Sequence, residues 1–275
     1  MEVIIKVFLN KLHKILGDLP LAVWFAVKLR NQASSIISSY FSEETNPSKN
    51  SEAWLIQVVA PYSSTFVDVG ANIGNWSSLF INSAPKSVQG ILFEPSQHTL
   101  KSLRQRFSEY QNIKIIEKGV GHCEGEVEFF DELGKGESSS IIQKASLKNA
   151  VKTVVKLTSL DIELNQNNVS YVDFLKIDAE GYDFQVLKGA VDFLNSQSIG
   201  IIQFEYGPGW KHGGATLSAA VSLLKSFGYQ VFLLKSHQLF KIDFEFYGEY
   251  FAYSNYVAVS PAKISSLGLN ITSRV

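Results

Sequence analysis

The stretch from Phe66 to Trp76 (FVDVGANIGNW) constrains the fold more than any other part of the sequence. A short run of β-branched and aromatic residues contains Asp68, is broken by Gly70 and Gly74, and leads into a helical pattern at Trp76. Strand, glycine turn and helix in this order form the rim of the nucleotide pocket in open α/β sheets. The turn brings the backbone close to a ligand, and the helix N-terminus directs free N–H groups at it.

Strand patterns and helical patterns alternate along the rest of the chain. This alternation predicts an α/β fold with a mainly parallel, doubly wound sheet and helices on both faces. An antiparallel strand is expected at 126–130 and an extended segment at 152–157. We expect core strands at 65–69, 88–93, 113–117, 172–177 and 199–204, closing strands at 229–234 and 256–259, and helices at 52–60, after Ser96, after Thr158 or Ser159 and at 216–227.

Polar or small residues stand where these strands end. In doubly wound sheets, ligands bind outside the carboxyl ends of the strands, where the strand order reverses. The sequence therefore predicts one shared site at that edge. The residues that we expect there are Asp68, Gly70, Glu94, Gly119, Asp178, Glu180 and Glu205.

The first turn favours a ligand without phosphate groups. Asn72 stands where a dinucleotide fingerprint has its second glycine, and no lysine follows the glycines as in a P-loop. Glu94 follows Gly74 by 20 residues and can accept hydrogen bonds from both hydroxyls of a ribose. S-adenosylmethionine is such an adenosine ligand, and its cationic groups suit Asp68 and Asp178. An NAD-dependent enzyme and a non-catalytic binding module with the same fold are the alternatives.

Seven stretches together resemble the FkbM family of S-adenosylmethionine-dependent methyltransferases. They lie in the family's order within residues 65–207, and residues 1–60 and 210–250 carry little of this resemblance. It implies a Rossmann-like class I methyltransferase fold, with a seven-stranded sheet whose last strand is antiparallel. It also implies O-methylation of a hydroxyl on a saccharide or related small molecule. The stretches are FVDVGANIGNWS (66–77), ILFEPS (91–96), KGVGHCEGEVEFF (118–130), the run 138–140, TSLD (158–161), FLKIDAEGYDFQVLKGA (174–190) and IIQFEYG (201–207).

The resemblance also implies roles for individual residues. Glu94 would hold the ribose, and Gly119 and Val120 would lie alongside the adenine. Asp178 would lie beside the methionyl amine and the transfer centre. The methionine portion would be held by the first turn, namely by Asp68, Gly70, Ala71, Asn72 and Gly74.

Methyl transfer to a hydroxyl benefits from a general base, because a protonated hydroxyl is a poor nucleophile. Glu180 and Glu205 are the first candidates, followed by Asp178. His122 and His212 are further candidates. The three carboxylates are also of the type that binds Mg²⁺, but nothing else in the sequence supports a metal, and no metal ligand is assigned.

Composition sets few further limits. The 275 residues carry a net charge of −1, which gives no argument for a nucleic-acid partner. Cys123 is the only cysteine, so no intramolecular disulfide forms, which fits a cytoplasmic protein. The oligomeric state cannot be read from the sequence.

The N-terminal segment has apolar residues at helical spacing between positions 4 and 16, with lysines among them. The apolar run 19–27 is far shorter than the roughly 20 residues that cross a bilayer. We expect residues 1–50 to form a helical appendage that packs on a methyltransferase domain at 51–275, with a polar linker at 42–51. A membrane-surface helix and an unusual signal sequence are the alternatives.

Overall fold

The computed structural model describes residues 2–42, 50–132, 139–142, 150–264 and 271–272. The chain divides into two compact units, Met1–Ser42 and Glu43–Val275. The first unit contains helices α1 (Glu2–Gly17) and α2 (Pro20–Phe41). None of the helices in the described ranges is both long and apolar enough to cross a membrane. Most of the predicted linker, residues 43–49, lies outside the described part of the chain.

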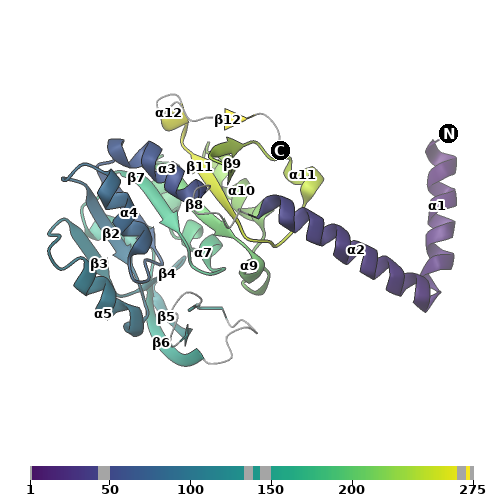
Figure 1. Cartoon of the computed structure of the whole chain (residues 1–275), viewed down its shortest axis with the longest axis horizontal. Coiled ribbons are helices and arrows are strands. Elements are labelled where there is room, and N and C mark those ends of the chain that lie inside the picture. The colour runs from purple at the N-terminus through teal and green to yellow at the C-terminus, as the bar shows by residue number, and fades with distance from the viewer. Residues whose placement is uncertain (1, 43–49, 133–138, 143–149, 265–270, 273–275) are drawn as a thin grey trace. The chain divides into compact units, whose positions relative to one another are not determined.

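The second unit is built on a large, mostly parallel sheet (Figure 1). Five neighbouring strands in the order β3-β2-β1-β7-β8 run parallel, and β11 pairs antiparallel with both β8 and β9. Because β1 pairs with β2 on one side and β7 on the other, the strand order reverses beside β1. The strands are β1 (Thr65–Val69), β2 (Gln89–Phe93), β3 (Ile113–Ile116), β7 (Val172–Ile177), β8 (Ile199–Tyr206), β9 (Gln230–Lys235), β10 (Gln238–Phe240), β11 (Ser254–Val259) and β12 (Ile271–Thr272).

The prediction of an α/β, Rossmann-like sheet is confirmed, including its antiparallel last core strand, but the number of seven strands is wrong. The described residues form nine, because β10 pairs antiparallel with β9 and β12 pairs with β10. A two-residue turn joins β9 to β10, with positive φ at Ser236 (49°) and His237 (58°). Hairpin turns of this kind are usually recognised by Asn-Gly or Asp-Gly, and Ser-His lacks that signature, so β10 was not predicted.

Helices cover both faces of the sheet, since every residue of β7 is buried. Side chains that cap a helix N-terminus include the predicted Ser159 and also Ser96 and Thr216, each of which accepts a backbone N–H. The helices are α3 (Ser51–Val59), α4 (Asn75–Ser83), α5 (Gln97–Arg106), α6 (Leu160–Gln166), α7 (Asp183–Lys188), α8 (Val191–Asn195), α9 (Pro208–His212), α10 (Leu217–Ser226), α11 (Phe244–Tyr247) and α12 (Pro261–Ile264).

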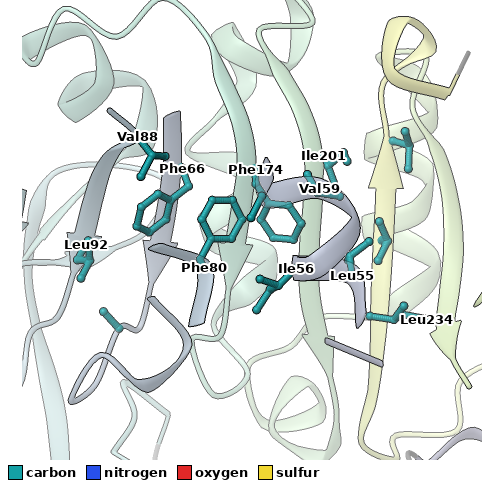
Figure 2. Close-up of a cluster of buried hydrophobic side chains, with 14 of the residues drawn as sticks. Leu55, Ile56, Val59, Phe66, Phe80, Val88, Leu92, Phe174, Ile201 and Leu234 are labelled. Atoms are coloured by element: carbon teal, nitrogen blue, oxygen red, sulfur yellow. The ribbon is translucent and has the colours of Figure 1, made fainter. Parts of the chain in front are cut away.

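One hydrophobic cluster fixes α3 and α4 on the sheet (Figure 2). Phe80 of α4 packs on Phe66 of β1 and Phe174 of β7, with ring centroids 4.7 and 5.5 Å apart. Leu79, the residue before Phe80, is 52% exposed, because adjacent positions on a helix point about 100° apart. The packing of Phe80 therefore fixes the position of α4 relative to β1, and with it the path of the glycine turn that joins them.

A smaller sheet stands beside the large one and follows the order β4-β6-β5. Its strands are β4 (Gly119–Val120), β5 (Gly125–Glu132) and β6 (Ala150–Thr158). The pairing of β5 with β6 is antiparallel, which confirms the expected antiparallel strand and the extended segment at 152–157. Residues 133–138 and 143–149, which include the first residue of the run 138–140, lie outside the described residues.

Candidate functional site

A pocket lies at the carboxyl ends of β1, β2 and β7, and β4 and β5 of the small sheet close its other side. It encloses about 660 Å³ of empty space, counted with its opening to solvent. Seven residues expected from the sequence line it: Gly70, Asn72, Glu94, Gly119, Val120, Asp178 and Glu180.

The backbone amides of the first turn are engaged by the protein itself. The N–H groups of Gly70 and Ala71 both donate to the carbonyl oxygen of Phe93, each at 3.0 Å. The amide of Asn72 donates to Glu94 Oε2 at 2.7 Å. A carboxylate therefore occupies the place where a dinucleotide fold would present this amide to a phosphate.

Glu94 is a buried carboxyl with two fixed partners. Besides the amide of Asn72, the amide of Ser96 donates to its Oε1 atom at 2.8 Å. Burial raises the pKa of Glu94 to about 7, although these two hydrogen bonds act to lower it. The Thr99 hydroxyl also forms a hydrogen bond that acts to lower this pKa. A carboxylate has about four acceptor positions, so these three groups leave capacity for a ligand in the pocket.

Gly70 lets the ends of β1 and β7 meet. Its φ is 81°, and a Cβ atom at this position would lie 2.0 Å from the carbonyl oxygen of Asp178. Gly74 also has a positive φ, and a Cβ there would lie 2.4 Å from Cε2 of Phe107. Gly74 thus serves the packing of α4 on the segment after α5, and it does not line the pocket.

Asp68 and Asp178 share one buried lysine. Lys176 Nζ lies 3.0 Å from Asp178 Oδ2 and 3.9 Å from Asp68 Oδ1. Burial alone would lower the pKa of Lys176, but the carboxylates of Asp178, Asp68 and Glu52 outweigh it, and the pKa is raised. Asp68 is fully buried and accepts a hydrogen bond from Ser77 Oγ at 2.5 Å. Asp178 lines the pocket, whereas Asp68 lies behind its wall.

Glu180 and Glu205 lie around a second, smaller pocket that adjoins the first. Glu180 belongs to both pockets and has a φ of 54°, which is unusual for a residue other than glycine. Burial, reinforced by Asp178, Asp183 and Glu180, raises the pKa of Glu205 to about 9. A carboxyl group with this pKa is mostly protonated at neutral pH, and in that form its hydroxyl can donate a hydrogen bond.

Asp183 shapes the loop after β7 and was not predicted from the sequence. Its carboxylate accepts the amides of Gly181 at 3.0 Å and Ala179 at 3.4 Å. Burial and the charge of Asp178 raise the pKa of Asp183 to about 7. An acidic residue two positions after a glycine is a signal for such a turn, since Asp side chains bond nearby backbone amides.

A network of hydroxyl hydrogen bonds links the small sheet to the pocket, and these bonds were not predicted from the sequence. Asp131 of β5 accepts Ser96 Oγ at 2.9 Å and Ser139 Oγ at 3.0 Å. Ser140 Oγ donates to the carbonyl oxygen of Glu180 at 3.2 Å. These bonds connect residues 139–142 to the segments that follow β2 and β7. Phe129 and Ile141 add an apolar wall to the pocket.

Some predicted residues lie elsewhere. Ala71 is buried outside the pocket wall, and His122 and His212 are exposed and do not line it. Tyr206 at the end of β8 and Trp210 of α9 are buried and pack on each other with ring centroids 5.3 Å apart. Within the described ranges, no three His, Cys, Asp or Glu side chains are grouped so that they could hold a metal ion.

Comparison with known proteins supplies a family. Residues 68–231 match the sequence model described as the methyltransferase FkbM domain. No curated protein matches the chain.

Solved structures similar to the chain include the FkbM methyltransferase of Methylobacillus flagellatus (14% identity, TM-score 0.45, 85% of this chain and 60% of that one). Others are the precorrin-6y C5,15-methyltransferase of Geobacter metallireducens (12%, 0.42, 81% and 95%) and an O-methyltransferase of Bacillus cereus in complex with SAH (8%, 0.38, 83% and 90%). This chain thus spans less than two thirds of the M. flagellatus protein. With TM-scores below 0.5, none of these likenesses bears on activity.

Proposed function

Because the chain belongs to the methyltransferase FkbM domain family, we propose that it transfers a methyl group from S-adenosylmethionine to a hydroxyl of a saccharide or related small molecule. The pocket at the reversal point of the strand order is the observation that carries this proposal. It gathers Gly70, Asn72, Glu94 and Asp178 from three separate strand ends. Such a place is where open α/β sheets bind their ligands.

The chemistry of the pocket fits an adenosine cofactor without phosphates. Glu94 already occupies the amide of Asn72, so a pyrophosphate would meet a carboxyl group instead of a free N–H. The remaining acceptor positions of Glu94 suit the two hydroxyls of a ribose. This argues against the NAD-dependent alternative, whose pyrophosphate requires close approach to the turn.

We assign the other parts of the cofactor by position. Gly119 and Val120 of β4 flank the adenine, with Phe129 and Ile141 adding apolar surface. Asp178, held by Lys176, lies beside the methionyl amine. The first turn borders the methionine portion through Gly70 and Asn72, and Ala71 holds the turn from behind the wall. Asp68 and Gly74 support this turn from behind the pocket wall.

The cofactor, when bound, supplies a methyl group already activated by its sulfonium. The protein's own task is then to align an acceptor oxygen with that methyl, which can contribute on the order of 7–11 kcal/mol. Glu180 is the residue that we assign as general base, because it borders both the main pocket and the adjoining one. Glu205 is protonated at neutral pH and is assigned as a hydrogen-bond donor to the acceptor.

Binding of S-adenosylhomocysteine, measured by calorimetry, tests the proposal. Saturable binding is expected, and Glu94→Ala should weaken it about ten- to a hundredfold, as each hydrogen bond to a charged group contributes about 1.5–3 kcal/mol. Glu94→Gln, which keeps the side chain's shape, and Glu128→Ala on the exposed side of β5 are the controls for folding. Absence of binding to the intact chain, or equal loss in Glu128→Ala, contradicts the assignment.

A screen with radiolabelled methyl donor against oligosaccharide pools addresses the acceptor. Incorporation of label distinguishes an enzyme from the alternative of a non-catalytic binding module. We place the methyltransferase domain at 51–275, with residues 1–50 as an appendage and linker, and the reaction in the cytoplasm, where the methyl donor is made.

A further inference from the structure

The first unit exposes an unusual amount of apolar surface. Phe8 of α1 and Phe25 of α2 are 66% and 64% exposed, and other large apolar side chains of both helices are exposed as well. Large contiguous apolar patches are rare on proteins that stay free in water, and they mark sites that bind another surface. The other large apolar side chains exposed here are Ile5, Val7, Leu9, Leu12, Ile15, Leu16, Leu19, Leu21, Val23, Trp24, Val27, Leu29, Ile36 and Tyr40.

Helix α1 is amphipathic. The exposed apolar residues Ile5, Phe8, Leu12 and Ile15 recur at intervals of three and four, which places them on one side of a helix. Lys6, Asn10, His13 and Lys14 fall on the opposite side by the same spacing. A helix with one apolar side and a basic polar side is the type that lies in the plane of a membrane interface.

The beginning of α2 is apolar on all sides. Leu21, Val23, Trp24, Phe25 and Val27 are all exposed, and adjacent helix positions point about 100° apart. A partner helix or a domain surface covers one stripe of a helix, so it would leave part of this ring in water. Lipid, in contrast, can contact every side of the first turns of a helix that enter the boundary between headgroups and acyl chains. The ring is nevertheless too short to span a bilayer.

The charge of this unit points to the lipid. Residues 2–42 contain five lysines and arginines but only two acidic residues, although the whole chain has a net charge of −1. Lys28 Nζ lies 5.5 Å from the ring centroid of Trp24. Tryptophan is enriched at the level of lipid headgroups, and a lysine beside it can extend its ammonium group to the phosphates.

We propose that α1 and the first turns of α2 bind the surface of a bilayer that contains anionic lipids. The apolar side of α1 and the apolar ring of α2 enter the boundary between headgroups and acyl chains, while Lys6, Lys11, Lys14, Lys28 and Arg30 face the phosphates. This goes beyond the proposed methyl transfer, since it concerns where the enzyme works, and it does not depend on the identity of the acceptor.

Flotation of the full chain with vesicles tests the proposal. We expect binding to phosphatidylcholine vesicles that contain phosphatidylglycerol, weaker binding to phosphatidylcholine alone, and a decrease with added salt. Each Lys→Gln change at positions 6, 11 and 14 should lower the partition coefficient about fivefold. The double variant Phe8→Glu/Phe25→Glu should lose binding. Phe246→Glu is the matched control, because Phe246 is 77% exposed in the other unit.

Fluorescence gives a second readout. On binding, Trp24 should leave water and shift its emission to shorter wavelength, and Trp24→Phe should remove that shift. Calorimetry with S-adenosylhomocysteine on the same variants separates this proposal from the proposed function, because binding of that ligand should persist when vesicle binding is lost. Failure to bind anionic vesicles overturns the membrane proposal. So does an equal loss in Phe246→Glu, or a stable dimer that covers the apolar face and ignores vesicles.

Discussion

Lys176 Nζ lies 3.0 Å from Asp178 Oδ2 and 3.9 Å from Asp68 Oδ1, so one buried ammonium group joins the carboxyl ends of β1 and β7. The two strands are neighbours, and Asp68 lies directly opposite Lys176 in their register. Trp76 of α4 adds its ring, whose centroid is 5.8 Å from the same nitrogen atom. The wall of the pocket therefore depends on a charge that does not itself line it.

Replacement of Lys176 by methionine should destabilise the fold. It leaves the fully buried Asp68 without its ion-pair partner and also removes the partner of Asp178, and loss of one member of a buried ion pair costs about 3–5 kcal/mol. Urea unfolding measures this difference. Lys152→Met is the matched control, because Lys152 pairs with Glu128 at the surface, where an ion pair contributes about 0–1 kcal/mol. Equal unfolding midpoints for the two variants would refute the structural role of Lys176.

Gly70→Ala should also be destabilising, for a steric reason. The added Cβ would lie 2.0 Å from the carbonyl oxygen of Asp178, and the φ of 81° is unfavourable for alanine. We expect a loss of at least about 2 kcal/mol, together with weaker binding of S-adenosylhomocysteine. Gly125→Ala provides the control, as a Cβ there meets no atom within 4 Å. Urea unfolding measures the stability of both variants. A Gly70→Ala protein as stable as Gly125→Ala would contradict the predicted steric clash.

Regular elements were predictable because their signals are local. The alternating patterns marked β1 and β7 at the correct residues, and the polar strand ends led to Glu94 and Asp178 in one pocket. Each of these inferences needs only a short window of sequence and the known geometry of parallel sheets.

Long-range partners were not predictable. No sequence pattern around Asp131 indicates that this carboxylate accepts a hydrogen bond from Ser96, 35 residues away. Asp68 was expected at the cofactor, but whether a strand-end carboxylate faces the pocket or a buried lysine depends on which strand lies next to it. The resemblance to a family supplied the residue types of the site, and the packing of the sheets decides their orientation.

The stability of the protein should fall as the pH rises from about 5 to 9. Burial raises the pKa of Glu205 from 4.5 to about 9, so the folded protein holds a proton that the unfolded chain releases in this interval. The free energy of unfolding therefore decreases with pH. Glu205→Gln cannot ionise, and its thermal midpoint at pH 8.5 should rise by several degrees, about 2–4 °C for each kcal/mol. Thermal scans at pH 5, 7 and 8.5 measure this. Glu128→Gln controls for the lost surface charge, and an unchanged slope in Glu205→Gln would show that the folded state does not retain the proton.

The assignment of Glu180 as general base predicts a specific kinetic difference. With an acceptor from the radiolabel screen, Glu180→Gln should lower kcat by about 10²- to 10⁴-fold while the affinity for S-adenosylhomocysteine stays within a few-fold. Glu205→Gln should lose much less, because Glu205 is already protonated at neutral pH and glutamine also donates a hydrogen bond. The pH profile of kcat supplies an independent criterion: its acidic limb should disappear in Glu180→Gln and persist in Glu205→Gln. The reverse pattern would identify Glu205 as the base and would mean that the bound cofactor's positive charge lowers its pKa enough for it to accept the proton.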